Sequence, residues 1–529
     1  MSTPVLDRRD ASVPAPRAED LGSRPGPEIP EPVFGATDRM RGLWVGLVIT
    51  LLAAATRFWD LRVPTDQGTP VFDEKHYVPQ GWQVLTGGNW IEDNPAYGLV
   101  VHPPVGKWLL AAGEWMFGYG PLGWRVMPAI FGVAIVVMIY CVTRRLSRST
   151  LIGAIAGIFA ICDGVLFVQS RMGMLDIFQT GFVVAAFTAL IADRDQVRRR
   201  IHRVYVEGRI HDSDFGPRYG FRWYRFTAGV MLGLVCGTKW SGIYYVLVFT
   251  VLAIGFDVAT RRAYHVRRPW MGTLVRDVVP SGLSLGVLPV AMYVATFIPW
   301  FNSETAVYRY EVGNRIGVDG PWAWIPAAWR SLWYYEAGIL KFHAGLTNAA
   351  GNHHPWESKP WTWPMSLRPM LYAISNGPDQ CGGGECVRAQ MLIGTPALWW
   401  LAVPMIGWGL WCWLIRRDWR YAAVLTAYAT GLLPWFAAID RQMYFFYATV
   451  MAPFLVIGLA LCCGDILRAA TGSGEHRTAR PERRTLAMLL VSVYVALVVA
   501  NFVWLWPILT GSPISPTMWH QQIWLPSWG

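Results

Sequence analysis

The chain has 529 residues, of which 53% are hydrophobic and only 15% are charged, and its mean hydropathy is +0.29. Soluble domains carry about 25% charged residues, so this composition excludes a set of soluble cytosolic domains. The formal net charge is +11, but the sequence lacks the zinc-ligand spacing and the basic, aromatic-lined groove pattern of nucleic-acid-binding proteins. The basic excess therefore indicates a membrane protein, and no nucleic-acid partner is expected.

Residues 1–40 combine prolines with scattered charges and few apolar residues, which predicts a disordered cytoplasmic tail. The rest of the chain is a series of apolar stretches. A membrane-spanning helix needs about 20 predominantly apolar residues. About eleven stretches are candidate passes: 41–60, 121–143, 149–168, 174–192, 226–239, 241–260, 278–300, 394–415, 421–439, 443–463 and 485–508. Residues 239–242 could either form a turn between two passes or interrupt one long helix.

The placement of arginine predicts the topology. Short cytoplasmic loops carry an excess of Lys and Arg. With a cytoplasmic N-terminus, every inner connection contains arginines, at 144–148, 194–203, 261–268, 416–420 and 477–484. The chain then divides into a transmembrane catalytic module at 41–300 with an outer loop at 61–120, an outer region at 301–393, C-terminal transmembrane helices at 394–508 and an outer tail at 509–529. The region 301–393 is rich in tryptophan and is expected to fold against the outer membrane face.

Two adjacent carboxylates, Asp73 and Glu74, lie in the first outer loop shortly after the first pass. A partly desolvated charge close to a membrane must be paired or used. One of the two could therefore serve as a general base. The alternative is a pair of solvated loop acids with Lys75 as their neighbour.

The same loop contains a His-Pro-Pro-Val-Gly-Lys motif at 102–107, followed by an apolar segment that is too short to span. The prolines fix the direction in which this segment begins, and we expect an interfacial helix. Lys107 would then lie at headgroup depth, where its ammonium can meet a lipid phosphate. The alternative is a lysine that only anchors the helix by extending its charge to the membrane surface.

Three cations, Arg171, Lys239 and Arg441, interrupt apolar passes near the outer face. Ionisable residues at membrane depth are candidates for function, and an arginine can bind phosphate in a bidentate manner. For Arg171, an ion pair with Asp176 that merely closes a helical hairpin is an equal alternative. Together the three cations point at one face of the membrane.

Cys381 and Cys386 are the two cysteines that lie in a polar loop, where Gly-Gly-Gly-Glu separates them. This flexible spacer lets two thiols meet in an oxidising compartment, which predicts a disulfide. The alternative is a pair of free thiols.

These motifs, in this order, resemble the protein O-mannosyltransferase family. The matching residues are Phe-Asp-Glu at 72–74, His-Pro-Pro-x-Gly-Lys at 102–107, Gln-Ser-Arg at 169–171 and Lys-Trp at 239–240, and the similarity extends over most of residues 40–510. The outer stretches 343–347 and 354–361 resemble the actinobacterial branch. Eukaryotic members carry an inserted β-trefoil domain in the loop that is 301–393 here. No trefoil repeat is recognisable in this loop, so acceptor selection by such a domain is not carried over.

The resemblance implies an all-α polytopic protein with the GT-C fold of lipid-dependent glycosyltransferases. It also implies inverting transfer of mannose from polyprenyl phosphate mannose to Ser/Thr hydroxyls of secreted polypeptides, at the outer face of the cell membrane. Such a displacement needs a base for the acceptor hydroxyl and cations for the departing phosphate. We assign Asp73 as the base and Glu74 as a supporting carboxylate that positions the acceptor or the donor sugar. Arg171, Lys239 and Arg441 are assigned to the phosphate, and His102 and Lys107 to the loop around it.

Tryptophans near 356–363 suggest the floor of a peptide-binding groove, and we assign acceptor binding to His354, Trp356, Glu357 and Trp361. The alternative is an aromatic belt that only packs at the membrane interface. Because cations can meet the charge of the leaving phosphate, no metal and no cofactor is expected. The expected partners are the lipid-linked donor, secreted polypeptides and the bilayer. The basic inner loops could in addition contact a protein secretion channel, or only anionic lipid.

Two other functions compete with this interpretation. A relative that moves a sugar from a lipid phosphate to another lipid or to a cell-wall glycan would use the same chemistry of Asp73 and the cations, but the stretch 343–361 and the Gln-Ser-Arg motif argue against it. A transporter also combines many passes with charges at membrane depth. Transporters usually show two halves with repeated hydropathy, and no internal repeat is recognisable here.

Overall fold

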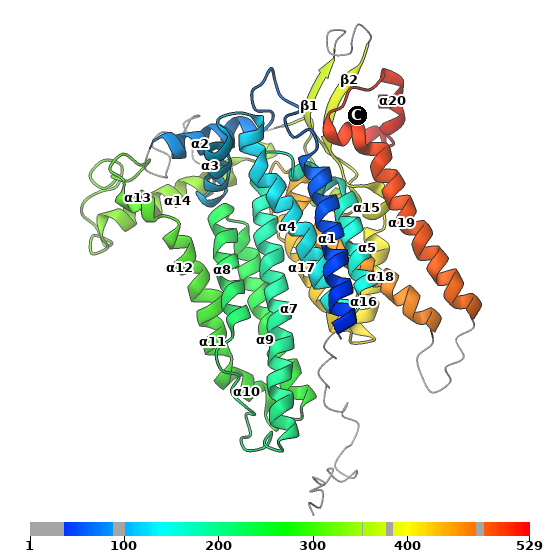
Figure 1. The fold of residues 1–529 in the computed structure, drawn as a ribbon. Helices are drawn as coiled ribbons and strands as arrows, with labels where there is room; N and C mark the ends of the chain where they lie inside the picture. The colour runs from blue at the N-terminus through cyan, green and yellow to red at the C-terminus, as the bar shows by residue number, and fades with distance from the viewer. Residues whose placement is uncertain (1–35, 88–100, 352, 377–384, 472–480) are drawn as a thin grey trace, which may run out of the picture.

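The computed structural model describes residues 36–87, 101–351, 353–376, 385–471 and 481–529. These residues form a bundle of long helices, and shorter helices and a two-stranded sheet gather at one end of it (Figure 1). We call this end the cap. Most of the predicted disordered tail, 1–40, lies outside the described residues. Its last five residues already belong to α1, which begins at Ala36.

Nine helical segments of the described chain are long and apolar enough to cross a membrane. They lie in α1 (Ala36–Phe58), α4 (Pro121–Ser147), α7 (Asp176–Val206), α9 (Gly242–Ala263), the run from α11 (Val278–Gly282) through a π-helical turn (Leu283–Val287) to α12 (Leu288–Ala295), α15 (Pro396–Trp399) with α16 (Ala402–Leu414), α17 (Trp419–Leu432) with its 3-10 extension (Leu433–Ala438), α18 (Ala452–Thr471) and α19 (Pro481–Thr510).

The two other predicted passes are helical but shorter. The stretch 149–168 forms α5 (Thr150–Cys162) and α6 (Gly164–Gln169), and the stretch 226–239 forms α8 (Trp223–Thr238). Asp163 separates α5 from α6 because its carboxylate accepts a hydrogen bond from the amide of Leu166 at 2.8 Å, as an N-cap does. By the length criterion, nine of the predicted eleven passes therefore qualify.

The break at residues 239–241 separates two antiparallel helices, which decides between the alternatives left open by the sequence. Arg222 and Arg225, at the start of α8, bind Asp257 near the end of α9 at 3.0 and 2.8 Å. The start of one helix thus lies beside the end of the other. Lys239 is consequently placed at the turn of a helical hairpin, next to the cap.

The cap contains the elements of the first predicted outer loop and most of those from 301–393. They are α2 (Glu74–Thr86), α3 (Val105–Phe117), α13 (Ile298–Asn302), α14 (Ala327–Gly345), the 3-10 turns Asn348–Ala350 and Pro360–Met365, and the antiparallel strands β1 (Met370–Asn376) and β2 (Val387–Leu392). The remaining short elements are α10 (Pro269–Arg276), the 3-10 turn Phe445–Val450, α20 (Pro516–Gln522) and the 3-10 turn Pro526–Trp528.

Helix α3 coincides with the predicted interfacial segment and is amphipathic. Leu110 and Glu114 are buried, whereas Trp115 is 73% exposed. Cys386, just before β2, takes part in a disulfide bond. Its expected partner, Cys381, lies outside the described residues, so the pairing of these two cysteines stays a prediction.

Helix α7 occupies the centre of the bundle. In the apolar stretch of α7 that is long enough to span a membrane, 83% of the residues are buried. The corresponding share is 22% in α1 and 17% in the run from α11 to α12. Interiors are densely packed and resist deformation. The first residue of α7, Asp176, is therefore held in a fixed place beneath the cap.

Candidate active site

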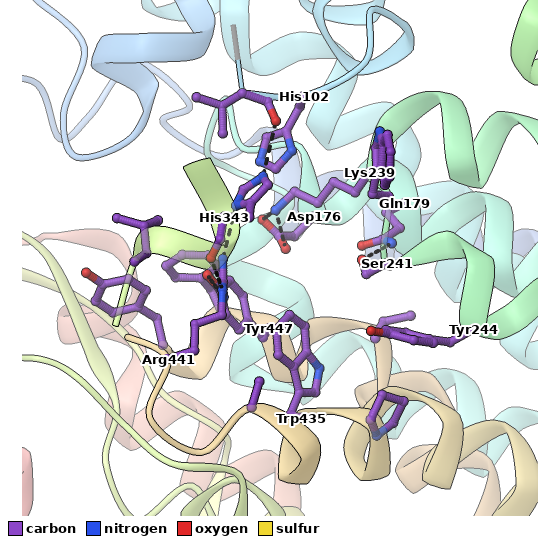
Figure 2. A pocket seen from close by; sticks show the side chains of 18 of the residues that line it. His102, Asp176, Gln179, Lys239, Ser241, Tyr244, His343, Trp435, Arg441 and Tyr447 are labelled. Atoms are coloured by element: carbon purple, nitrogen blue, oxygen red, sulfur yellow. Dashed lines mark hydrogen bonds and ion pairs between the residues drawn. The ribbon is translucent and has the colours of Figure 1, made fainter. Parts of the chain in front are cut away.

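A cavity of about 670 Å³ lies where the cap meets the bundle. Figure 2 shows cationic, acidic and aromatic side chains converging on it from segments that are far apart in the sequence. Its walls come from α2, the start of α7, the turn between α8 and α9, the end of α14 and residues 430–450. The polar lining residues are Asp73, His76, Tyr77, Gln80, His102, Asp176, Gln179, Lys239, Trp240, Ser241, Tyr244, Tyr245, His343, Thr430, Trp435, Arg441, Gln442, Tyr444 and Tyr447.

Asp73 lines this cavity at the N-cap of α2. The preceding residue, Phe72, has a φ of 50°, which bulky residues rarely adopt, and its ring stacks on Tyr372 with the centroids 4.7 Å apart. Strain of this kind persists where the surroundings enforce it. Desolvation raises the pKa of the Asp73 carboxyl to about 6; Lys239 opposes the rise and Asp176 adds to it. The result is a carboxylate that is more basic than an ordinary aspartate.

Glu74 is adjacent to Asp73 in sequence but does not line the cavity. Its carboxylate is fully buried and binds Nε and Nη2 of Arg125 at 2.8 and 2.7 Å. The amides of Gly173 and Val71 also donate to it, at 2.7 and 3.2 Å. Consecutive residues at the start of a helix point in different directions. Glu74 therefore fixes the backbone beside the base and does not face the cavity. This corrects the assignment of Glu74 as a carboxylate that positions a substrate.

Lys239 faces the cavity from the turn between α8 and α9. Its ammonium binds both carboxylate oxygens of Asp176 at 2.8 Å. An ammonium has three N–H donors, so this pairing orients the group and leaves one donor for an anion. Below it, the amide of Gln179 donates to the hydroxyl of Ser241 at 2.8 Å, which ties α7 to the start of α9 (Figure 2).

Arg441 reaches the cavity from the short connection between the 3-10 extension of α17 and the next 3-10 turn. Its Nε donates to the backbone oxygen of His343 at 3.2 Å, Nη2 to Nδ1 of the same histidine at 3.1 Å, and Nη1 to the hydroxyl of Tyr447 at 3.0 Å. Because a guanidinium only donates, Nδ1 of His343 must accept, and Nε2–H donates to the oxygen of Val101 at 3.2 Å. Desolvation, with Arg441 as the next cause, lowers the pKa of His343 to about 4. His343 is thus a neutral support for the cation.

His102 and Lys107 occupy different places. The His102 ring lines the cavity and stacks on His343 at 5.4 Å between centroids. Desolvation and then the neighbouring cations, Lys239 first among them, lower the pKa of His102 well below its ordinary value, so the ring is neutral near pH 7. Lys107 is buried outside the cavity lining and donates to the backbone oxygen of His102 at 2.9 Å. Lys107 thus holds the loop that carries His102, which is one part of its assignment. Its ammonium does not reach the predicted phosphate site.

The structure places Arg171 outside the predicted phosphate site. Arg171 is fully buried but is absent from the cavity lining, and its guanidinium donates to the backbone oxygens of Arg57 at 3.1 Å and Asp60 at 3.0 Å. These carbonyls lie at the end of α1, where the last helical carbonyls need donors and favour a cation. The alternative ion pair with Asp176 does not form either, because Asp176 binds Lys239.

The four residues assigned to acceptor binding lie beside the cavity without lining it. The His354 ring packs edge-on against Tyr444, which does line the cavity, at 5.3 Å. The guanidinium of Arg368 covers the Trp356 ring, and Trp361 is more than half exposed. Glu357 binds Lys359 at 2.5 Å. The structure thus leaves acceptor binding by this segment as a prediction and gives Glu357 a different set of partners.

Several lining or supporting residues were missed by the sequence analysis. Arg125, His343 and Tyr447 each make contacts that shape the site, yet two of them lie within or next to apolar stretches and look like packing residues. The available signal was a charged residue at the start of a pass, for Arg125, and membership of the 343–347 stretch, for His343.

Comparison with known proteins defines the class. The described fold matches the structure of the Saccharomyces cerevisiae protein O-mannosyltransferase Pmt1-Pmt2 complex bound to the sugar donor, with a TM-score of 0.69, 13% identity and coverage of 94% of this chain and 93% of that chain. At this identity the match establishes the fold alone. The protein is therefore a multi-pass membrane protein with the GT-C fold of membrane glycosyltransferases, as the sequence predicts.

The family follows from the sequence matches. Residues 47–303 match the model described as dolichyl-phosphate-mannose-protein mannosyltransferase, and residues 328–528 match the C-terminal four-transmembrane region of protein O-mannosyltransferases. The polyprenol-phosphate-mannose--protein mannosyltransferase of Mycolicibacterium smegmatis is 59% identical over 95% of this chain and 96% of its own length. The enzyme of that name from Corynebacterium glutamicum is 46% identical over 91% and 92%. The chain belongs to the protein O-mannosyltransferase family, which confirms the predicted family and enzyme class.

Proposed function

We propose that this chain transfers mannose from polyprenol phosphate mannose to Ser/Thr hydroxyls of polypeptides, with inversion at the anomeric carbon. The observation that carries the proposal is that Asp73, a carboxylate of raised pKa, shares one cavity with Lys239 and Arg441. The names of the relatives that cover almost the whole chain supply the donor and the acceptor class.

The reaction is a single displacement. Asp73 takes the proton of the acceptor hydroxyl as its oxygen bonds to the anomeric carbon, and the bond from that carbon to the phosphate oxygen breaks. The electron pair leaves with polyprenyl phosphate. Lys239 and Arg441 stabilise the charge that develops on the phosphate, because fixed cations in a water-poor site need no reorganisation during the reaction. We propose that these cations suffice and that no metal or cofactor takes part.

The cavity also offers an approach for the lipid chain of the donor. Among its lining residues, Leu340 on α14 of the cap and Ile243 and Tyr244 in the first turn of α9 are 47%, 44% and 39% exposed. Exposed apolar side chains next to a membrane-spanning surface favour hydrocarbon. This arrangement supports entry of a polyprenyl chain from the bilayer while its phosphate stays at the cations.

We further propose that the protein lies in the cell membrane with its N-terminus in the cytoplasm and the cavity on the outer face. The arginine-rich loops support this orientation. Arg145 and Arg148, at the end of α4, both bind Asp195 far along α7 from Asp176 and the cavity. Acceptors would then be polypeptides that have crossed the membrane, and the basic loops remain available to a protein secretion channel or to anionic lipid.

The test compares purified wild type with Asp73→Asn. Both are incubated with radiolabelled polyprenyl phosphate mannose and a Ser/Thr/Pro-rich peptide, and donor binding is measured separately. We expect the wild type to label the peptide, and the variant to bind donor but transfer at least about a hundredfold more slowly, which is the lower range for loss of a general base. Equal transfer by both proteins would refute the base assignment. Label in a lipid or glycan instead of the peptide would refute the acceptor class.

A further inference from the structure

The segment 346–359 packs against the connection that carries Arg441. The backbone amide of Asn348 donates to the oxygen of Asp440 at 2.8 Å, and the amide of Gln442 donates to the oxygen of Leu346 at 2.9 Å. Further along, the amide of Ser358 donates to the oxygen of Met443 at 2.8 Å. Backbone hydrogen bonds to this one segment therefore flank Arg441 on both sides. Beyond residue 346 the segment does not line the cavity.

A polar side-chain cluster reinforces this contact. The ammonium of Lys359 donates to the backbone oxygen of Ile439 at 2.9 Å and to that of Arg441 at 3.1 Å. Ile439 directly follows the 3-10 extension of α17, and carbonyls at a helix end favour a cation. Glu357 binds the same ammonium at 2.5 Å, and Asn348 donates to both oxygens of Glu357 at 3.0 Å. The three side chains form a closed network around one backbone turn.

We infer that Lys359, Glu357 and Asn348 are positioning residues for Arg441 and thereby set the affinity for the phosphate of the lipid donor. We call these three residues the clamp. The clamp acts through the backbone of Arg441, since its ammonium binds the carbonyl of that residue and not its guanidinium. The inference rests on the proposed function in one respect, namely that Arg441 binds the donor phosphate.

The clamp matters because the guanidinium has little freedom of its own. Its contacts with His343 and Tyr447 require the turn to present it in one direction. A binding group must be held within a fraction of an ångström by its supporting shell to keep its geometry. Ile439 and Asp440 are exposed, and they follow an extension that is only partly buried. Among the described residues, the other contacts of this turn are the backbone hydrogen bonds to the segment 346–359 and a contact of Nη1 of Arg441 with the oxygen of Gln442 at 3.5 Å.

The test measures binding of undecaprenyl phosphate to the full-length protein in nanodiscs, together with the KM for acceptor peptide. Lys359→Met should weaken binding of undecaprenyl phosphate about tenfold, as expected for a displaced binding group, and leave the acceptor KM within about twofold. The matched control is Lys341→Met, an exposed lysine on α14, which should change neither value. A Lys359→Met protein with wild-type phosphate affinity overturns the inference, and so does a raised acceptor KM with unchanged phosphate affinity, which would return Glu357 to acceptor binding.

A double-mutant cycle identifies the route of the effect. If the clamp acts through Arg441, adding Lys359→Met to Arg441→Gln should weaken binding by less than about twofold more, whereas independent effects would multiply. Multiplied effects therefore overturn the inference. If Lys359→Met does not fold, Glu357→Gln replaces it in the test, because this variant removes the charge that holds Lys359 and keeps an acceptor for Asn348. An unchanged affinity of Glu357→Gln for undecaprenyl phosphate would also overturn the inference. A wild type that does not bind undecaprenyl phosphate refutes the phosphate site of the proposed function and the clamp with it.

Discussion

The pH dependence of transfer follows from the burial of Asp73. Desolvation raises the pKa of its carboxyl from 3.8 to about 6, and the group must be ionised to accept the proton of the acceptor hydroxyl. For a single titrating base the ionised fraction is about 90% at pH 7, about 50% at pH 6 and about 10% at pH 5. We therefore expect kcat/KM to fall about tenfold from pH 7 to pH 5. An aspartate of ordinary pKa would lose less than about a tenth over this range.

The assay is the initial rate of label transfer from subsaturating donor to peptide, measured between pH 5 and pH 8 with purified protein. The two histidines nearest the cations do not complicate the profile. The pKa of His343 is lowered to about 4 and that of His102 is lowered well below its ordinary value. Thermal unfolding recorded at each pH separates loss of the base from loss of the fold.

The burial of Asp73 also affects stability: the ionised carboxylate that the reaction needs destabilises the folded protein. A carboxyl whose pKa is raised on folding costs stability when it is ionised, and this cost grows as the pH rises from 3.8 through 6 and is complete above it. The rise corresponds to at most about 3 kcal/mol. Asp73→Asn removes the charge, so at pH 7 it should raise the unfolding temperature while it slows transfer at least about a hundredfold.

Two results would refute this reasoning. A wild-type kcat/KM that stays constant between pH 5 and pH 7 would mean that Asp73 has an ordinary pKa or is not the base. An Asp73→Asn protein that is less stable than the wild type at pH 7 would mean that the carboxylate makes favourable contacts that outweigh its desolvation.

Three further predictions concern the surroundings of the base. Lys239→Met should weaken binding of undecaprenyl phosphate about 10- to 100-fold, the value of a charge-assisted hydrogen bond; unchanged affinity would contradict its role. Arg125→Met should lower the free energy of unfolding by about 3–5 kcal/mol because Glu74 is left buried and unpaired. The control is Arg62→Met, at an exposed arginine, which should leave the unfolding temperature at the wild-type value. Equal unfolding temperatures of the wild type and both variants would show that the ion pair adds no stability. Chelation with EDTA should leave transfer unchanged, and activity that is lost and restored by a divalent ion would disprove the proposal that Lys239 and Arg441 suffice.

Much of the fold could be predicted because it depends on local sequence properties. Apolar stretches must hide their backbone polar groups in helices, whatever their neighbours are, and all eleven predicted stretches are largely helical. Helix length was less predictable. Asp163 divides the predicted stretch 149–168 into α5 and α6 because it caps α6, whereas α8 slightly exceeds its predicted stretch 226–239 and ends at the turn that carries Lys239.

The candidate site was predicted in part. Asp73, Lys239 and Arg441 share the cavity, as expected for charges that are costly close to the membrane unless they are used, and His102 from the neighbouring motif joins them. Arg171 looked equivalent by the same criterion, yet it binds the end of α1. A buried cation can meet a ligand or a row of carbonyls, and the sequence contains no signal that distinguishes these partners.

The sequence by itself determined the class of protein, the order of the passes and the residue types available for chemistry, because these follow from hydropathy, charge and short motifs. Only the tertiary structure decided which charges meet. Glu74 and Asp73 are neighbours in the chain but face different surroundings, whereas Arg441 and His343 lie far apart in the chain and bind each other. Contacts of that kind depend on how helices pack, and packing is a property of the whole bundle.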